Sequence, residues 1–305
     1  MSAQTKPARK KVTIQQLQAK KQQQTPITML TAYDYSSALL VDQADIDMIL
    51  VGDSLAMVML GMDSTVPVTM DEMLHHCRAV ARGAQRPFLV GDMPFMSFQA
   101  SISEALHNAG RFLKEGGMEA VKLEGGRPMA ATIQALTRVG IPVLGHIGLT
   151  PQSVTALSGY KVQGKTAVAA HDLLLDALAL QDAGCFGIVL EAVPAPIAAA
   201  ISQRLTIPTI GIGAGAGCDG QVLVYHDLLG LFDKFQAKFV KQYANIGQQI
   251  VSALQQYRDE VQQRTFPDAA HSYDLPAEEW AQFVALLEAS RSNPSDAHSP
   301  MTDDS

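Results

Sequence analysis

The chain has 305 residues, of which 47% are hydrophobic, and it carries a net charge of -7 at pH 7. Its 30 acidic residues outnumber its 23 basic residues, which argues against a protein that binds nucleic acid through a basic surface. No apolar run approaches the roughly 18 residues of a membrane span, so no membrane association is expected. The three cysteines are far apart and lack CxxC spacing, so we expect no disulfide framework and a reducing, cytoplasmic location.

The N-terminal segment is basic, and its first acidic residue is Asp34. It contains no apolar core of the kind that a secretory signal requires. We interpret residues 1–12 as a disordered basic arm that precedes a glutamine-rich helix from about Thr13. An organellar targeting segment is the alternative interpretation of the same residues.

Short, continuously apolar runs recur along the chain, and most end at a glycine or a polar residue. They cover residues 27–34, 48–54, 88–94, 120–126, 142–148, 187–194 and 208–215, and an eighth lies within 220–230. Continuous apolar runs are typical of strands that are covered on both faces, and such strands are usually parallel. We therefore expect eight parallel strands.

Helix signals lie between these runs. Thr69 is followed three residues later by Glu72, and Ser101 in the same way by Glu104, which predicts two capping boxes. Regular alternation of strands and helices favours a (β/α)8 barrel, and a doubly wound open sheet is the alternative. The open sheet usually carries an early glycine-rich phosphate loop, whereas GIGAGAG at 211–217 comes late and does not match GxGxxG. We interpret that stretch as a turn at the end of a strand.

The composition changes near residue 267. We expect the barrel to occupy residues 13–266 and a C-terminal extension to occupy residues 267–305. Within the extension we predict an amphipathic helix at about 276–292 and a disordered tail after it. Four apolar side chains of this helix form one stripe, which we expect to dock on the barrel or on a neighbouring subunit: Trp280, Phe283, Val284 and Leu287.

Ionisable residues stand at the ends of most of the predicted strands. They are Asp34, Asp53, Asp92, Lys122, Glu124, His146 and Glu191. In a parallel barrel the carboxyl ends of the strands meet on one face, which carries the active site. Several carboxylates at one mouth repel each other unless a cation lies between them, and oxygen ligands favour Mg²⁺ over Zn²⁺.

Structural roles compete with this interpretation. A single aspartate at a strand end is often a helix cap, and the histidine in GHIG is often a core residue. A barrel with no catalytic role is therefore the alternative to a metal-assisted enzyme. Burying this many charges is costly for a barrel that performs no chemistry, so we favour the enzyme.

Several long motifs occur in order between about residues 13 and 274. They are AYDYSSA, ILVGDSLAMVMLGMDSTVPVT, GDMPF, VKLEGG, PVLGHIGLTPQSV, GYKVQGK, VLEAVP, IPTIGIGAG and CDGQVLVYHDLLG. This set resembles the 3-methyl-2-oxobutanoate hydroxymethyltransferases, also called ketopantoate hydroxymethyltransferases. The resemblance implies a barrel enzyme that transfers a one-carbon unit from 5,10-methylenetetrahydrofolate to C3 of 3-methyl-2-oxobutanoate, toward pantothenate and coenzyme A. It also implies Mg²⁺, with other divalent ions as alternatives, and a homo-oligomer, namely a decamer of two five-membered rings.

The resemblance also implies roles for individual residues. Asp53 and Asp92 bind the metal, and Glu124 completes its ligand set, directly or through water. Ser54 hydrogen-bonds the substrate carboxylate. Lys122 offsets the remaining negative charge of the substrate. Asp53 and Asp92 also belong to the substrate-binding residues.

Deprotonation of C3 requires a base and a group that stabilises the developing enolate. The resemblance makes Glu191 the proton acceptor and His146 a supporting residue that orients groups or relays protons. We expect residues 150–165 to form a mobile lid, with an ordinary long loop as the alternative. Asp34 is expected at the rim or in a structural role. A metal-dependent barrel lyase or mutase that acts on another 2-oxo acid is the competing enzyme class.

Overall fold

The computed structural model describes residues 10–156, 159–232 and 237–292. The chain divides into two compact units, one that extends to Gly247 and one that begins at Gln248. The expected disordered arm and tail lie outside the described residues, except for residues 10–12. Of these, Val12 is buried in the core, and Lys11 forms an ion pair with Glu119 at 2.8 Å.

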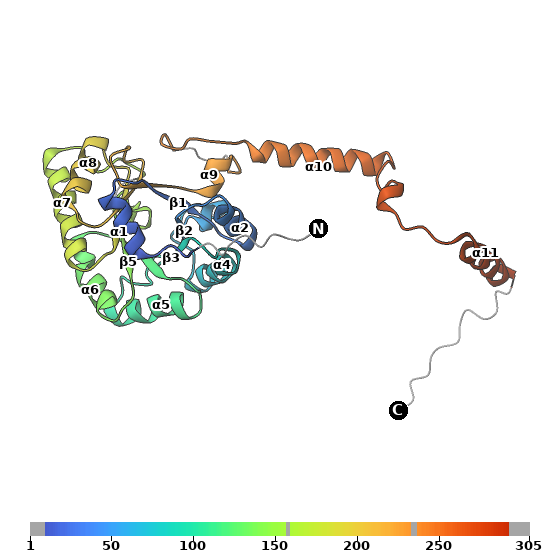
Figure 1. The fold of residues 1–305 in the computed structure, drawn as a ribbon, viewed down its shortest axis with the longest axis horizontal. Coiled ribbons are helices and arrows are strands. Elements are labelled where there is room, and N and C mark those ends of the chain that lie inside the picture. The colour runs from blue at the N-terminus through green and yellow to red at the C-terminus, as the bar shows by residue number, and fades with distance from the viewer. Residues whose placement is uncertain (1–9, 157–158, 233–236, 293–305) are drawn as a thin grey trace, which may run out of the picture. The chain divides into compact units, whose positions relative to one another are not determined.

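The first unit is a closed barrel of eight parallel strands in sequence order (Figure 1). The strands are β1 (Ile27–Thr31), β2 (Met48–Val51), β3 (Phe88–Asp92), β4 (Ala120–Glu124), β5 (Val143–Gly148), β6 (Gly187–Glu191), β7 (Thr209–Ile212) and β8 (Gly220–Leu223). Closure of β1 against β8 confirms the (β/α)8 barrel and excludes the doubly wound open sheet. Each predicted apolar run contains one of these strands.

Helices alternate with the strands and surround the barrel (Figure 1). They are α1 (Ile14–Gln22), α2 (Tyr35–Gln43), α3 (Leu55–Val58), α4 (Met70–Gly83), α5 (Ile102–Lys114), α6 (Ala130–Arg138), α7 (Ala167–Asp182), α8 (Ala195–Arg204) and α9 (Tyr225–Leu229), with short 3₁₀ turns η1 (Arg127–Met129) and η2 (Pro151–Ser153). The sheet is therefore covered on its outer face, as the apolar strands require.

Local capping explains where several helices begin. The hydroxyl oxygen of Thr69 accepts a hydrogen bond from the backbone N–H of Glu72, and the carboxylate of Glu72 accepts one from the backbone N–H of Thr69. This pair of bonds confirms the predicted capping box of α4. Thr13 caps α1 in the same way. At α5 only half of the predicted capping box forms. Ser101 Oγ accepts a hydrogen bond from the backbone N–H of Glu104, but the Glu104 carboxylate accepts none from the backbone N–H of Ser101.

Side chains along each strand alternate between two buried environments. Met48 and Leu50 of β2 point into the barrel interior, which α1 closes at one end with Leu17. Ile49 and Val51 instead pack in the layer between the strands and the helices. Because both faces are buried, the strand shows no apolar–polar alternation in the sequence.

The strand register brings the polar strand ends to one level. Asp92 of β3 lies opposite Lys122 of β4, and Glu124 lies opposite His146 of β5. Gly148 of β5 lies opposite Glu191 of β6. The register therefore gathers these side chains at the carboxyl end of the barrel.

Helix α10 (Ile246–Gln262) begins at the end of the first unit and extends into the second, which also holds η3 (Ala269–His271) and α11 (Ala277–Ser292). Helix α11 forms where the sequence predicts a helix, and the large apolar side chains of its predicted stripe are about half exposed, for example Trp280 and Leu287. The division at Gly247 precedes the boundary that we expected at residue 267. None of the described helices is long and apolar enough to cross a membrane.

Candidate active site

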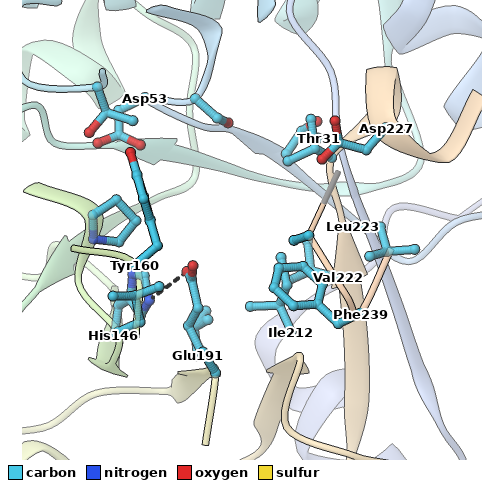
Figure 2. A pocket seen from close by; sticks show the side chains of 18 of the residues that line it. Thr31, Asp53, His146, Tyr160, Glu191, Ile212, Val222, Leu223, Asp227 and Phe239 are labelled. Carbon is cyan, nitrogen blue, oxygen red and sulfur yellow. Dashed lines mark ion pairs between the residues drawn. The ribbon is translucent and has the colours of Figure 1, made fainter. Parts of the chain in front are cut away.

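A cavity of about 330 Å³ opens at the carboxyl ends of the strands. Its volume lies at the lower end of the range for small-molecule sites. Seven of the residues singled out from the sequence line it: Asp53, Ser54, Asp92, Lys122, Glu124, His146 and Glu191. Figure 2 shows Asp53, His146 and Glu191 on one side of this cavity.

The end of β2 places two polar residues at the cavity. The strand ends at Val51, and the chain turns at Asp53 and Ser54 before the short helix α3. The backbone N–H of Asp53 donates to Asp92 Oδ2 at 3.1 Å, and Ser54 Oγ lies 2.9 Å from the hydroxyl of the buried Tyr33. The apolar strand therefore ends in a polar turn because that turn forms part of the cavity wall.

Lys122 is a buried cation among these carboxylates. Its Nζ lies 2.8 Å from Asp92 Oδ1 and 3.9 Å from Glu124 Oε1. Burial opposes the charged form, but Asp92, Glu124 and Asp53 together hold the pKa of Lys122 above its ordinary value. Burial also raises the pKa of Asp92 to about 7, in spite of Lys122. One lysine thus does not offset the negative charge of this cluster.

The contacts of His146 determine its tautomer. Lys122 Nζ lies 3.1 Å from His146 Nδ1, and because an ammonium group only donates, Nδ1 is the acceptor. Burial and the adjacent Lys122 hold the pKa of His146 well below its ordinary value, so the ring is neutral with its proton on Nε2.

His146 Nε2 lies 3.1 Å from Glu191 Oε2 (Figure 2). The protonated nitrogen thus faces the carboxyl group of Glu191. Burial raises the pKa of Glu191 to about 8. A carboxyl group whose pKa lies near neutrality can both accept and release a proton at working pH.

Gln152 is a site residue that the sequence analysis missed. It lies in η2, is 5% exposed, and its Nε2 donates to Asp53 Oδ2 at 3.0 Å and to the carbonyl of Met93 at 2.9 Å. Its backbone N–H donates to Glu124 Oε2 at 3.0 Å. Gln152 therefore links the ends of β2, β3 and β4.

The segment from 150 to 165 contributes to the site at two places, near its start and on the C-terminal side of residues 157–158. Gln152 is buried near its start, and Tyr160, Lys161 and Val162 line the cavity. Residues 157–158 lie outside the described part of the chain. Closure of this segment over the cavity remains a prediction.

Asp34 takes no part in the cavity wall. Its carboxylate accepts from the backbone N–H of Ser37 at 2.6 Å and caps α2. This confirms the structural role that we expected. In contrast, Asp227 of α9 does line the cavity, and the sequence analysis did not single it out, although it lies within the stretch 220–230 that was expected to hold the eighth strand.

The donor chemistry at this mouth suits a hard cation. In the described residues, Glu124 Oε1 is buried and accepts no hydrogen bond, and burial raises the pKa of Glu124 well above its ordinary value. Across the same described ranges, no three His, Cys, Asp or Glu side chains converge closely enough to hold one ion. Lys122 lies within 4 Å of both Asp92 and Glu124, so it occupies part of the space that such ligands would share. The oxygen chemistry and excess negative charge of these carboxylates suit a divalent ion, whereas their present arrangement does not bring three of them to one point.

Comparisons with known proteins identify the family. A family model described as ketopantoate hydroxymethyltransferase matches residues 11–269. The 3-methyl-2-oxobutanoate hydroxymethyltransferase of Moorella thermoacetica is 58% identical over 87% of this chain and 98% of its own length. The enzyme of the same name from Syntrophus aciditrophicus is 55% identical over 90% of this chain and 100% of its own.

A solved phosphoenolpyruvate phosphomutase from Streptomyces platensis subsp. rosaceus shares the fold. It has a TM-score of 0.55 and 16% identity, and the match covers 93% of this chain and 99% of that one. At this identity the likeness concerns the fold alone. The family assignment rests instead on the sequence relatives, which are similar along nearly their whole length. The chain therefore belongs to the ketopantoate hydroxymethyltransferase family and is a hydroxymethyltransferase of pantothenate biosynthesis.

Proposed function

We propose that the chain adds the hydroxymethyl group to C3 of 3-methyl-2-oxobutanoate by metal-assisted enolate formation, with 5,10-methylenetetrahydrofolate as the one-carbon donor. The observation that carries this proposal is the pair of Glu191 and neutral His146, 3.1 Å apart. It lies in the same cavity as the carboxylates of Asp53, Asp92 and Glu124. A base on one side and an electrophilic centre on the other are what enolate formation requires.

Glu191 is the proposed proton acceptor. Its ionised form is a stronger base than an ordinary carboxylate, because burial raises its pKa to about 8. The N–H at Nε2 of His146 lies 3.1 Å from Oε2 of that carboxylate, and Lys122 holds the imidazole in the required tautomer through Nδ1. Glu191 removes the proton from C3 and retains it while the enolate reacts.

Asp53, Asp92 and Glu124 are the proposed residues for a divalent ion, with Mg²⁺ as the expected one and other divalent ions as alternatives. When bound, such an ion supplies a Lewis acid that polarises the keto and carboxylate oxygens of the 2-oxo acid. Gln152 holds the carboxylates of Asp53 and Glu124 in place.

Lys122 and Ser54 are the proposed contacts to the substrate itself. The ammonium group of Lys122 is buried and stays charged, so it offsets the negative charge that develops on the enolate oxygen. Ser54 presents a hydroxyl group at the cavity wall and hydrogen-bonds the substrate carboxylate. The hydroxyl of Tyr33 fixes its orientation.

The carbon transfer then follows from the enolate. C3 forms a bond to the methylene carbon of the folate while that carbon loses its bond to one of its two folate nitrogens. One water molecule then adds its oxygen to the same carbon as the bond to the second nitrogen breaks. The proton that Glu191 took from C3 and one proton of the water go to the two released nitrogens, which gives the hydroxymethyl product and tetrahydrofolate. Closure of residues 150–165 would exclude bulk water from this step.

The cytoplasmic location and the decamer of two five-membered rings are proposals of the same kind. The net charge of -7 supports small-molecule substrates rather than nucleic acid.

Proton exchange in D₂O tests the proposal directly. The protein is incubated with 3-methyl-2-oxobutanoate, with and without Mg²⁺ and without folate, and the C3–H signal is followed by NMR. We expect metal-dependent loss of that signal, its abolition in Glu191→Gln, and formation of ketopantoate once methylenetetrahydrofolate is added.

Two results would count against parts of this scheme. Product formation without prior exchange would show that deprotonation requires the folate to be bound. If neither exchange nor product appeared, the substrate or the base would be wrong, and a barrel lyase that acts on another 2-oxo acid would be favoured.

A further inference from the structure

The cavity has a second end that the proposed chemistry of the 2-oxo acid does not use. Figure 2 shows Thr31, Asp227, Val222, Ile212 and Phe239 facing Glu191 and His146 across the open space. These residues belong to the same cavity as the carboxylate cluster. The two ends differ in character, because the second end has apolar walls and a single carboxylate among these residues.

The apolar walls come from the last strands of the barrel and the segment that follows them. Ile212 ends β7, Val222 lies in β8, and Phe239 comes from the chain after α9. The Phe239 ring packs closely against Gly213, since a Cβ at that position would lie only 2.6 Å from the ring. Gly213 has a φ of +63°, which a residue with a side chain rarely adopts. The glycine at position 213 in the motif GIGAG thus leaves the space that the Phe239 ring occupies in the cavity wall.

Asp227 is the polar group at this end. It lies in α9, where it is partly buried, and burial raises its pKa to about 6. From the residues that the structure describes, its carboxylate receives no hydrogen bond and no ion pair. At neutral pH the group is therefore mainly an ionised acceptor that faces a cavity without a protein partner.

A carboxylate beside apolar walls matches one part of a tetrahydrofolate. The 2-amino-4-oxopyrimidine half of its pterin ring presents two adjacent N–H donors in one plane, and a carboxylate accepts such a pair in bidentate fashion. The flat faces of the ring are apolar enough to lie against Ile212, Val222 and Phe239. The one-carbon unit is carried on the opposite side of the ring system, which would face Glu191.

We propose that Asp227 and the apolar walls around it form the subsite for the pterin ring of the one-carbon donor, with Asp227 as the residue that recognises its amino-pyrimidine edge. This inference rests on the proposed function, in which methylenetetrahydrofolate is that donor. It gives the two substrates opposite ends of one cavity, so that C3 and the methylene carbon meet between them.

Steady-state kinetics of Asp227→Asn test the assignment. Asparagine keeps the size of the side chain but offers one acceptor and no charge, so one charge-assisted hydrogen bond is lost and the other is weakened. We expect the KM for methylenetetrahydrofolate to rise about ten- to hundredfold, while the KM for 3-methyl-2-oxobutanoate stays within about twofold. Metal-dependent exchange of C3–H without folate should be unchanged, because it uses the other end of the cavity.

Asp182→Asn is the matched control. Asp182 is an exposed residue at the end of α7 and does not line the cavity. The substitution removes the same charge, so any effect shared by both variants reflects net charge alone. Both KM values should be unchanged in this control.

A second measurement uses the wild-type protein and does not depend on how the variant folds. Calorimetric titration compares tetrahydrofolate with its 2-desamino analogue, which lacks one of the two donors. We expect the wild type to bind the analogue at least about tenfold more weakly, and Asp227→Asn to lose most of that discrimination.

The outcomes separate this inference from the proposed function. Equal binding of the two folates by the wild type, or an unchanged folate KM in Asp227→Asn, would overturn the pterin subsite and leave the reaction intact. A rise in the KM for the 2-oxo acid instead would mean that the apolar end holds the isopropyl group, which also overturns it. If the wild type formed no product with methylenetetrahydrofolate but still exchanged C3–H, the proposed donor would be wrong.

Discussion

Replacing Glu191 by glutamine should remove activity and, at high pH, stabilise the protein. In the folded state burial raises the pKa of Glu191 from 4.5 to about 8. Between these two values the folded protein holds a proton that the unfolded chain releases, so the wild type loses stability as the pH rises through this window. Glutamine does not ionise, so the variant avoids this loss.

The magnitude follows from the difference in pKa. Each unit of pKa difference corresponds to about 1.4 kcal/mol, which sets an upper limit of about 5 kcal/mol above pH 8. The side chain of Glu191 is 15% exposed, and solvent reduces the effect, so we expect roughly 2 kcal/mol. For a unit the size of this barrel, that corresponds to a gain of about 4–8 °C in melting temperature.

The assay is a series of thermal melts of wild type and Glu191→Gln from pH 5 to pH 9, without substrate and with a chelator. The difference in melting temperature should be near zero at pH 5, grow through neutral pH, and level off above pH 8. Glu104→Gln, at an exposed position in α5, should show no such trend. A difference for Glu191→Gln that is independent of pH would refute the view that this carboxyl group is buried and protonated at neutral pH.

Three further predictions follow from other contacts. Gln152→Ala removes the donor to Asp53 and to the carbonyl of Met93. It should lower the free energy of unfolding, measured in urea, by about 2 kcal/mol, and it should weaken Mg²⁺ binding in calorimetric titration. An unchanged Mg²⁺ affinity would contradict the link between Gln152 and the proposed metal ligands. Asp34→Ala should cost about 1 kcal/mol of stability through the lost cap of α2, with C3–H exchange unaffected, whereas loss of exchange would place Asp34 in the chemistry. Deletion of residues 268–305 should change solubility, assembly or melting temperature if the Trp280 stripe docks as expected, and no change in any of the three would end that idea.

Much of the barrel could be predicted because its strands are buried on both faces. Met48 and Leu50 pack inside, while Ile49 and Val51 pack under the helices, and this arrangement leaves a continuous apolar run that is easily recognised. The capping box at Thr69 is equally local, because it depends on residues three positions apart. At Ser101 the same pattern formed only one of its two bonds, since the Glu104 side chain is exposed and free to point elsewhere.

The strand-end residues of the site were also visible in the sequence, because a charge at the end of an apolar strand is unusual and the barrel brings all such ends to one face. The sequence could not indicate Gln152 or Asp227 in the same way. Gln152 lies in a loop after β5, yet it contacts Asp53 and Glu124 from two earlier strands. Asp227 lies in a five-residue helix after β8, and no pattern distinguishes it from an exposed acid.

The sequence by itself thus determined the order of strands and helices and the face on which the chemistry lies, because these depend on local periodicity and on chain direction. It favoured the closed barrel over an open sheet, and the pairing of β1 with β8 in the tertiary structure decided between them. Only the tertiary structure decided how the polar groups pair: that Lys122 lies between Asp92 and Glu124, that His146 presents its protonated nitrogen to Glu191, and that the cavity has a second, apolar end. These features depend on side chains that are distant in the sequence and meet only when the barrel closes. Their pKa values depend in turn on the burial that closure creates.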